Sequence, residues 1–567
     1  MKYSEQQPRQ SLKPLLAVLL AVFSPLAAAQ AAGPGVPDAG SILQQIQPVK
    51  PPAASSSGTG LTIEPDGAAK LPPSAPFAVK TILISGNTLF DTPALHALVA
   101  DGEGKSLTLS QLGELAARIT EHYRSNGYLL ARAIIPAQTI STGVVRIEVI
   151  EARYAKVLLN NSSRVNDPLL EATLAPLQSG QVIGQADMER ALLLLSDVPG
   201  VVVAATLRPG EAVGTSDLLV TTTAGPVVWG NVTLDNYGNR YTGRVRLAGT
   251  VNYNNPLHHG DVLSASALSS GRGMSYGRIG YESLLNGRGT RLGGAYSALR
   301  YELGESLAAL DVHGTAEIAS LWAKHPLVRS RDVNLYAQIQ HDHMQLRDHV
   351  DVIAIQTDRH LRNWTMSLSG DARDGFLSGG VNTWNVGWTI GRLGFDDAAA
   401  QAADAATART EGNFSKWNVN LARVQRLSPK ITLALSASGQ VANDNLDSSQ
   451  KMSVGGPYSV RAYDAGTVSG DSGYQGTVEL RFDLGQAWQG QWQAVAFVDG
   501  AHVTVNKTAW TAGINSDSLS GAGVGLNWSG PDLWSVKSFV AEPIGSTPVL
   551  AGATKSLLAW VEISKRF

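Results

Sequence analysis

The sequence of 567 residues contains no cysteine, which excludes disulfide frameworks, thiolate zinc sites and cysteine nucleophiles. Charged residues are also scarce, at 16%, against roughly 25% in soluble domains. The 45 basic and 47 acidic residues nearly cancel, so the chain lacks the basic surplus of a general nucleic-acid binder. The length suggests about three or four domains.

Apolar runs are short, and none reaches the roughly 20 residues of a membrane-spanning helix. The run Leu15–Phe23 follows a positively charged start and precedes the small residues Ala27–Ala29. This order predicts a secretory signal peptide over residues 1–29. A membrane anchor is the alternative, but Pro25 cuts the run short. We therefore expect an exported chain without a spanning helix.

The region 30–47 contains one short amphipathic segment, whose apolar residues share a face at helical spacing: Ile42, Leu43 and Ile46. Asp38 or Ser41 is suited to cap this helix. Residues 48–76 are rich in Pro, Ala, Ser and Gly and predict a flexible linker. A helix on a tether can dock and leave, although the pattern alone favours a frayed terminus without a role.

Residues 77–152 predict a compact α+β module with the order strand, helix, helix, strand, strand. Its long helix starts at Thr108 or Ser110 and ends at Gly127. The same order recurs over residues 153–225, with little residue identity. Two such modules in tandem indicate a binding platform, because neither carries a catalytic grouping.

Residues 226–567 alternate apolar and polar side chains in short segments, with Gly, Asn and Asp between them. The segments 243–253, 431–439 and 474–484 are clear examples. In the last, the apolar side is Tyr474, Val478, Leu480, Phe482 and Leu484, and the polar side is Gln475, Thr477, Glu479, Arg481 and Asp483. About sixteen such strands are recognisable.

A period of two with one apolar and one charged face has two physical solutions. A soluble sandwich buries the apolar face, whereas a transmembrane barrel turns it to lipid. Export without a spanning helix favours the barrel, because in lipid every backbone group must pair internally. The terminal Phe567 of a final alternating strand agrees with an outer-membrane barrel.

Four short motifs accompany this layout: PDAGSILQQI at Pro37–Ile46, Asn255-Pro256-Leu257 followed by Gly260-Asp261, Val460-Arg461-Ala462-Tyr463 in a long insert at 442–472, and Phe497-Val498-Asp499-Gly500. Together they resemble the two-partner secretion transporters (TpsB) of the hemolysin secretion/activation ShlB/FhaC/HecB family, over nearly the whole mature chain. The resemblance implies a plug helix in 30–47, a linker at 48–76, POTRA domains at 77–152 and 153–225, and a sixteen-stranded barrel at 226–567.

Within this resemblance, residues 460–463 correspond to the tip of an extracellular loop folded into the pore, and Phe497, Asp499 and Gly500 to a motif on the inner wall. Asp499 alternates in register with Gln493 and therefore faces the lumen of a barrel. The planar fork of Arg461 suits a carboxylate. The resemblance implies a salt bridge between Arg461 and Asp499 that holds the loop inside. Without the resemblance, the simpler interpretation is that Arg461 and Asp499 are two unrelated charges.

One residue departs from the family pattern, because Ala462 stands where the family has Gly. Glycine tolerates a positive φ that alanine resists, so the backbone of the tip is expected to differ.

Other groupings predict less. His341, His343 and His349 near Asp342 and Asp348 could hold a metal, but a solvated lumen or loop is the simpler interpretation. Gly521–Gly525 resembles a phosphate loop only superficially, because no helix follows. The scattered tryptophans are expected in interfacial belts or on outer faces: Trp364, Trp384, Trp388, Trp417, Trp528 and Trp560. We predict no metal site, no cofactor and no catalytic residue.

The resemblance implies an outer-membrane pore of a Gram-negative bacterium, with its POTRA domains in the periplasm. These domains would capture an unfolded partner exoprotein of the TpsA type, such as an adhesin, a hemolysin or a contact-dependent toxin. Outer-membrane lipid would surround a barrel that works as a monomer. Three alternatives remain: a barrel insertase of the same superfamily, a solute porin and an outer-membrane lipase or protease.

Overall fold

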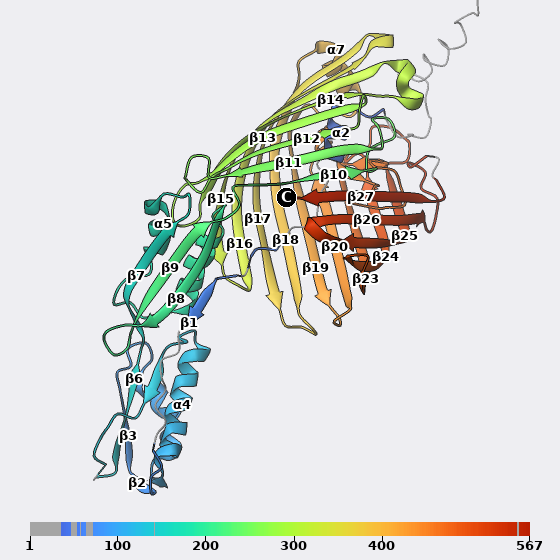
Figure 1. Ribbon diagram of the computed structural model, residues 1–567. Helices are drawn as coiled ribbons and strands as arrows, with labels where there is room; N and C mark the ends of the chain where they lie inside the picture. Colours follow the sequence, from blue (N-terminus) through green and yellow to red (C-terminus); the bar gives the residue numbers. More distant parts are fainter. Residues whose placement is uncertain (1–35, 47–53, 57, 64–71, 141, 553–554) are drawn as a thin grey trace, which may run out of the picture.

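The computed structural model describes residues 36–46, 54–56, 58–63, 72–140, 142–552 and 555–567. The predicted signal peptide and part of the predicted linker lie outside these residues. Among the described residues, no helix has both the length and the apolar character needed to cross a membrane. Figure 1 shows two small modules in a row that extend from one end of a large barrel.

The first module, residues 77–152, has the predicted order of elements. Thr108 and Gln111 cap the long helix reciprocally, and Gly127, at φ 87°, follows its end, as expected from the sequence. A small pair of strands, β2 and β4, is an addition to the prediction. The elements are β2 (Phe77–Val79), β3 (Thr81–Ser85), α3 (Thr92–Ala97), η1 (Ala100–Gly102), β4 (Lys105–Leu107), α4 (Leu109–Ser125), β5 (Arg132–Ile134) and β6 (Val144–Ile150).

The second module repeats this topology. In the first module β3 pairs in parallel with β6, and in the second the first strand likewise pairs in parallel with the last; in both, the last strand pairs antiparallel with the strand before it. Helices pack on one face of each sheet and close an apolar core. The elements are β7 (Arg153–Ser162), α5 (Asp167–Leu174), α6 (Gln185–Ser196), β8 (Val201–Pro209) and β9 (Thr215–Ala224).

The predicted flexible linker contains a strand, and the prediction is wrong at this strand. Leu61–Ile63 forms strand β1, which pairs in parallel with residues 205–207 of β8. An edge strand offers unpaired N–H and C=O groups to any extended segment, whatever its composition. Leu61 also packs against the core of the second module.

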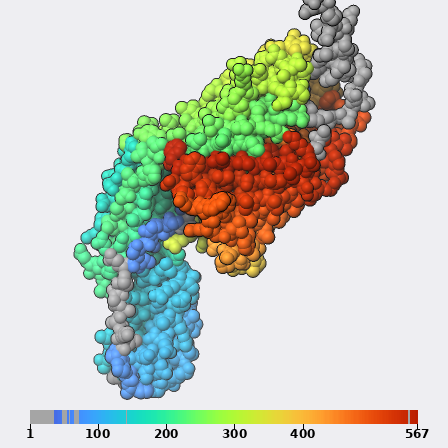
Figure 2. Space-filling model, turned by 45° about the vertical axis from the view of Figure 1, so that its right-hand side comes forward, coloured from blue at the N-terminus to red at the C-terminus, as the bar shows by residue number. Residues whose placement is uncertain are grey.

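Residues 228–566 form a closed barrel of sixteen strands, as predicted. Strand β27 pairs with β10 over Asn231–Asp235, so the end of the chain closes the sheet against its first strand. Figure 2 shows these C-terminal strands, in red, lying against the green β10–β11 region. The strands are β10 (Val228–Asp235), β11 (Arg246–Asn254), β12 (Val262–Ser269), β13 (Met274–Leu284), β14 (Arg291–Glu302), β15 (Val312–Arg329), β16 (Val333–Val350), β17 (Ile355–Asp374), β18 (Gly380–Phe395), β19 (Gly412–Arg426), β20 (Ile431–Ala442), β23 (Ser472–Ala487), β24 (Gly490–Thr504), β25 (Ser516–Ser529), β26 (Trp534–Pro543) and β27 (Leu558–Arg566).

The predicted alternation sets the two faces of the wall. On β11, Leu247 and Val251 are exposed outward, whereas Arg246 and Asn252 are buried on the lumen side. Val478 and Leu480 of β23 also point outward, and Glu479 between them is buried. A closed sheet pairs its backbone groups internally, so such a wall can stand in lipid.

Strands β15, β16 and β17 have 18, 18 and 20 residues, against 8 in β10 and β12. At the end of the barrel far from the modules, their polarity is reversed. Leu346 and Leu361 are fully buried and face inward, whereas Glu317 and Arg347 pair with each other on the outside at 3.6 Å. The inward apolar side chains surround the helix α2 (Ala39–Ile46), which lies inside the barrel.

A buried carboxylate ties the C-terminal end of the first module to its own loop and long helix. Glu151, between β6 and β7, accepts hydrogen bonds from the backbone N–H groups of Thr88 at 2.7 Å and Leu89 at 2.9 Å, and from the Tyr123 hydroxyl at 2.8 Å. Burial by itself raises the pKa of Glu151, but these hydrogen bonds outweigh burial and hold the pKa below its usual value.

Replacing Glu151 by Gln should remove part of the acid sensitivity of the modules. A carboxylate whose pKa is lower in the folded state stabilises that state above its unfolded pKa, and the stabilisation is lost as the pH falls through the folded value. Denaturant titrations of the full chain in detergent, followed by far-ultraviolet circular dichroism, report on the helices, which lie mainly in the modules. Between about pH 5 and about pH 3, the wild type should lose more free energy of unfolding than Glu151→Gln. Glu148→Gln, on the exposed side of β6, is the matched control and should behave like the wild type. Equal losses in the wild type and Glu151→Gln would contradict this role.

Candidate functional site

The connection between β20 and β23, residues 443–471, folds into the barrel. We call it the inward loop; it contains η4 (Ser448–Gln450), β21 (Met452–Val454) and β22 (Val468–Gly470). The motif predicted for its tip is buried against β24, β25 and β26, with Val460, Ala462 and Tyr463 at most 2% exposed. The structure therefore brings the two predicted motifs together on the inner wall.

Arg461 is the centre of this contact. Its Nε and Nη2 donate to the two carboxylate oxygens of Asp499 at 2.9 Å each, and its backbone N–H donates to Asp499 at 3.1 Å. Its Nη1 donates to Glu479 on the neighbouring strand at 2.8 Å. Arg461 is 5% exposed and Asp499 is 1% exposed. A guanidinium this far from water is stable only beside carboxylates, and the second carboxylate was missed in the sequence.

Aromatic rings enclose the same guanidinium. Its central carbon lies 3.3 Å from the ring centroid of Phe497 and 5.1 Å from that of Phe539. Trp560 of β27 donates its indole N–H to the Arg461 carbonyl oxygen at 2.7 Å. The expectation that Trp560 lies in an outer belt is therefore wrong, because it is 1% exposed and holds the loop from inside. Gly500, the last residue of the predicted wall motif, pairs with β23 and β25, and a Cβ added there would meet open space.

The alanine at the tip is accommodated without strain. Ala462 does not adopt a positive φ, so the turn does not need glycine at this position. Gly455, Gly456 and Gly466 supply the positive φ angles of the loop instead. The methyl group of Ala462 packs against Gly521 of β25, where an added Cβ would lie only 2.5 Å away. Gly521, in the glycine-rich run 521–525 of β25, thus leaves space for the loop tip.

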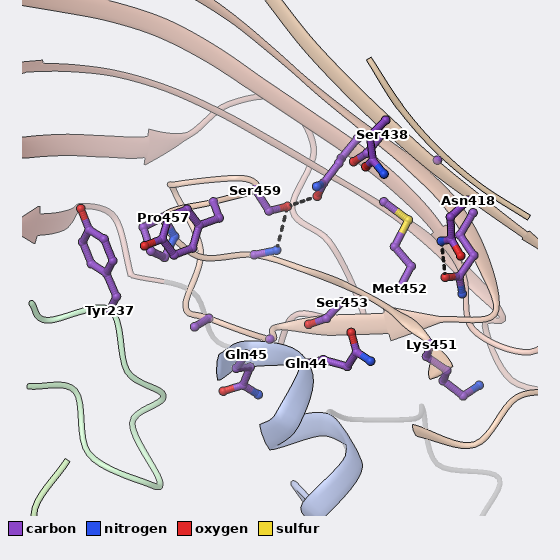
Figure 3. Close-up of a pocket in the computed structure, with 18 of the residues that line it drawn as sticks. Gln44, Gln45, Tyr237, Asn418, Ser438, Lys451, Met452, Ser453, Pro457 and Ser459 are labelled. Atoms are coloured by element: carbon purple, nitrogen blue, oxygen red, sulfur yellow. Dashed lines mark hydrogen bonds between the residues drawn. The ribbon is translucent and has the colours of Figure 1, made fainter. Parts of the chain in front are cut away.

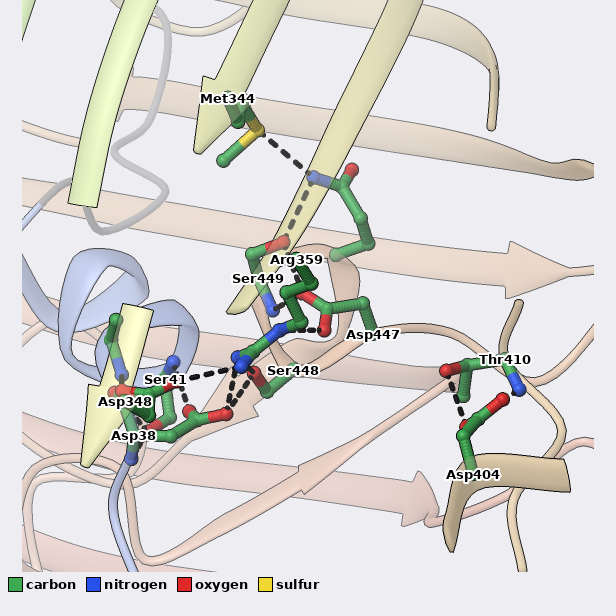
Figure 4. Close-up of polar contacts among 12 residues, drawn as sticks. Asp38, Ser41, Met344, Asp348, Arg359, Asp404, Thr410, Asp447, Ser448 and Ser449 are labelled. Atoms are coloured by element: carbon green, nitrogen blue, oxygen red, sulfur yellow. Dashed lines mark hydrogen bonds and ion pairs between the residues drawn. The ribbon is translucent and has the colours of Figure 1, made fainter. Parts of the chain in front are cut away.

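A second buried arginine holds the helix α2, which we call the plug helix. Arg359 of β17 donates to Asp38 at 2.7 Å, to Asp348 at 2.6 Å and to Asp447 of the inward loop at 2.6 Å (Figure 4). One guanidinium thus ties the plug helix, the wall and the inward loop together. Ala39 at the start of the helix also donates its N–H to Asp348 at 2.8 Å.

The plug helix is capped and fitted as its sequence suggested. Asp38 accepts from the N–H of Ser41 while Ser41 Oγ accepts from the N–H of Asp38, both at 2.9 Å, so the two candidate caps act reciprocally. Ile42 and Leu43 are buried, as the predicted apolar face requires, and Ile46 packs beside them. At Gly40 an added Cβ would lie 2.4 Å from Ser448 Oγ, so the helix touches the inward loop directly.

A third ion pair lies under the loop near the closing seam. Asp235 of β10 accepts from Arg246 of β11 at 2.8 Å, and both residues are at most 6% exposed. The ring of Tyr237 lies 5.6 Å from that of Tyr458 in the inward loop and 5.9 Å from that of Trp560. This pair was not predicted from the sequence, although Arg246 lies in the alternating segment 243–253 that was singled out there.

Between the plug helix, the inward loop and strands β19 and β20 lies a cavity of about 240 Å³ (Figure 3). Its lining is mostly uncharged and polar, with Gln44 and Gln45 from the helix, Ser459 from the loop, and Asn418 and Ser438 from the wall. Amides and hydroxyls of this kind offer weak hydrogen bonds to any backbone without selecting a sequence.

The motif at residues 255–261 forms the turn between β11 and β12, and this turn contacts the second module. The buried Asp261 accepts from the N–H groups of Leu257 at 3.0 Å and His259 at 2.9 Å, and Asn255 donates its side-chain N–H to the Pro199 carbonyl. On the other side, Arg329 of β15 forms a two-pronged pair with Asp197 after α6, at 2.7 and 2.8 Å. These contacts fix how the second module meets the barrel.

The predicted histidine grouping does not converge. His341 stacks near Trp364, and His349 stacks on His313. Asp348 points to Arg359 instead. No group of three His, Asp or Glu side chains is arranged to hold a metal ion in the part of the chain that the structure describes. Trp364 and Trp417 are 47% exposed on the outer face, as expected.

The packing of Ala462 on Gly521 leads to a reciprocal test. Gly521→Ala should push the loop tip off the wall, because crowding of this kind typically costs about 1–3 kcal/mol. Trypsin would then cut after Arg461 at least about fivefold faster, since such cleavage follows the population of the open form. Ala462→Gly in the same chain should restore protection. Gly500→Ala is the matched control, because an added Cβ there meets open space. Unchanged cleavage in Gly521→Ala would contradict the packing.

Comparisons with known proteins agree with this architecture. The family model "Haemolysin secretion/activation protein ShlB/FhaC/HecB" matches residues 214–528, and the model "POTRA domain, ShlB-type" matches residues 77–152. The heme/hemopexin transporter protein HuxB of Haemophilus influenzae is 28% identical over 547 residues, which are 94% of this chain and 95% of that protein. The outer membrane transporter CdiB of Escherichia coli is 27% identical over 488 residues, 80% of each chain.

The solved structure of CdiB from Escherichia coli matches with a TM-score of 0.69 over 89% of this chain and 93% of that one, at 24% identity. Its fold is therefore the fold of this chain. The barrel, the two modules and the matching family model all indicate the same family. The chain belongs to the haemolysin secretion/activation ShlB/FhaC/HecB family, the two-partner secretion transporters that carry partner exoproteins across the outer membrane, with their POTRA domains in the periplasm.

Proposed function

We propose that the pore rests in a closed state held by two separate latches, and that an arriving exoprotein opens it. The observation that carries this proposal is Arg461, buried between Asp499 and Glu479 at the tip of the inward loop. Arg359 of β17 is the second latch and holds the plug helix through Asp38. Breaking a buried ion pair costs about 3–5 kcal/mol, which keeps the pore shut at rest but stays within reach of protein binding energies.

The second POTRA module offers the exoprotein an edge to bind. Among the described residues, β1 pairs with residues 205–207 of β8, whereas β8 runs over Val201–Pro209. An extended segment could pair with more of this edge, gaining main-chain hydrogen bonds with little demand on sequence. Because β1 belongs to the linker of the plug helix, its displacement would pull on the plug.

We propose further that the transporter works as a monomer, without an enzymatic step, and that its apolar outer face contacts outer-membrane lipid. One chain closes the barrel, and outward side chains such as Val478 and Leu480 are apolar. The cargo would be a single TpsA-type exoprotein. Since HuxB is named for heme and hemopexin, an exoprotein that binds hemopexin is the first to look for.

Cells that lack this protein should lose one large exoprotein from the medium or cell surface, and the wild-type gene should restore it. Mass spectrometry of the medium, the shaved cell surface and the outer membrane measures this. A broad loss of outer-membrane barrels would instead indicate an insertase. Altered uptake of small solutes with unchanged exoproteins would indicate a porin.

Arg461→Ala should open the pore, because it leaves Asp499 and Glu479 buried without their shared cation. The loss of about 3–5 kcal/mol from the closed state predicts frequent, long openings in planar bilayers and impaired secretion. Arg481→Ala is the control, since Arg481 bonds to Glu479 at 2.7 Å but does not reach the loop tip. Normal conductance and secretion in Arg461→Ala would refute the latch.

A further inference from the structure

A large cavity lies where the second module meets the barrel. It has a volume of about 710 Å³ and is bordered by Leu194 and Asp197 at the end of α6, by the inner wall of β13–β16, and by Ser55 of the linker. We call it the rim cavity. The second module thus meets the lumen at this cavity.

The acidic side chains around the rim cavity are all engaged. Glu282 accepts from Arg291 Nε at 2.5 Å and from the Trp322 indole N–H at 2.8 Å. Asp197 is held by Arg329, and Asp371 accepts from Arg373 at 2.9 Å and from the backbone N–H of Ser55 at 2.9 Å. Their negative charge is therefore already balanced by protein groups.

Two cations of the rim cavity have no such balance. Among the described residues, neither Arg278 nor Lys324 lies within 4.0 Å of a carboxylate. Lys324 Nζ sits 4.6 Å from the ring centroid of Tyr336 and stands directly opposite Arg291 on the neighbouring strand. Like charges in directly opposed positions destabilise a sheet. Glu282 neutralises Arg291, but no described carboxylate does the same for Lys324, so an anion in the cavity would balance this lysine.

The cavity also presents a rigid aromatic surface. The indole of Trp322 lies against Gly293, where an added Cβ would meet the ring at 2.3 Å. Glu282 holds the indole N–H, so the ring is fixed in place. Tryptophan, tyrosine and arginine are the side chains that most often carry the energy of protein–protein contacts.

We infer that the rim cavity binds an acidic, extended segment of the exoprotein as it enters the barrel. The inference rests on the proposed function and adds which segments the entrance favours. A polypeptide is the occupant that fits, because the cavity lies between the end of α6 in the second module and the lumen, and its free charges are spread over β13 and β15. Each partly exposed ion pair is worth about 0–1 kcal/mol, so a passing chain is guided without being trapped.

Peptide binding to the full chain in detergent tests the inference directly. Fluorescein-labelled decapeptides of glutamate, glutamine and lysine serve as probes, with fluorescence anisotropy as the readout. The glutamate peptide should bind best, and Arg278→Gln with Lys324→Gln should weaken it about fivefold. Lys430→Gln removes a lysine from an exposed turn elsewhere on the periplasmic rim and should leave binding unchanged. Equal binding of the lysine peptide, or no effect of the double variant, would overturn the inference.

Complementation of the deletion strain separates this inference from the function. The inference holds if the wild type restores secretion of an exoprotein and the double variant Arg278→Glu with Lys324→Glu restores severalfold less of it. Both strains must contain the same amount of heat-modifiable barrel in the membrane. Equal restoration by both refutes the inference and leaves the transport function intact. No restoration by the wild type refutes the function itself.

Discussion

Arg461 and Arg359 are both withdrawn from water, and each is balanced by carboxylates that come from other elements. Asp499 and Glu479 lie on the wall, whereas Asp38 and Asp447 lie on the plug helix and the inward loop. A buried guanidinium without these partners would be far less stable. The positions of the inward loop and the plug helix therefore follow from where the barrel wall presents its charged side chains.

The two latches share no residue, yet they are mechanically connected. Asp447 ties the inward loop to Arg359, and Gly40 brings the plug helix against Ser448 of the same loop. Movement of the inward loop therefore disturbs the contacts of the plug helix, and the reverse also holds. Apolar packing of Ile42 and Leu43 against the far end of the wall adds to the hold, and it disappears once the helix leaves.

Three surfaces in the second module, at the barrel entrance and inside the lumen have a different character. The edge of β8 offers backbone groups, the rim cavity offers uncompensated cations and a fixed indole, and the cavity beside the plug helix offers amides and hydroxyls. General contacts of this kind along the proposed route suit an unfolded chain that must move on, whereas buried ion pairs hold the inward loop and the plug helix.

Period-two alternation was enough to predict the barrel and the orientation of its faces, because the pleat sends successive side chains to opposite sides whatever their partners are. Local signals also placed the ends of helix α4 at Thr108 and Gly127, and the caps of the plug helix, since capping depends on residues three positions apart. The resemblance to a family was needed to pair Arg461 with Asp499. Only the tertiary structure added Glu479, the cluster around Arg359, the inward position of Trp560 and the space that Gly521 leaves for Ala462. Each of these depends on strand register and on the path of a loop, which bring together residues that lie tens to hundreds of positions apart, and no local pattern in the chain records such distances.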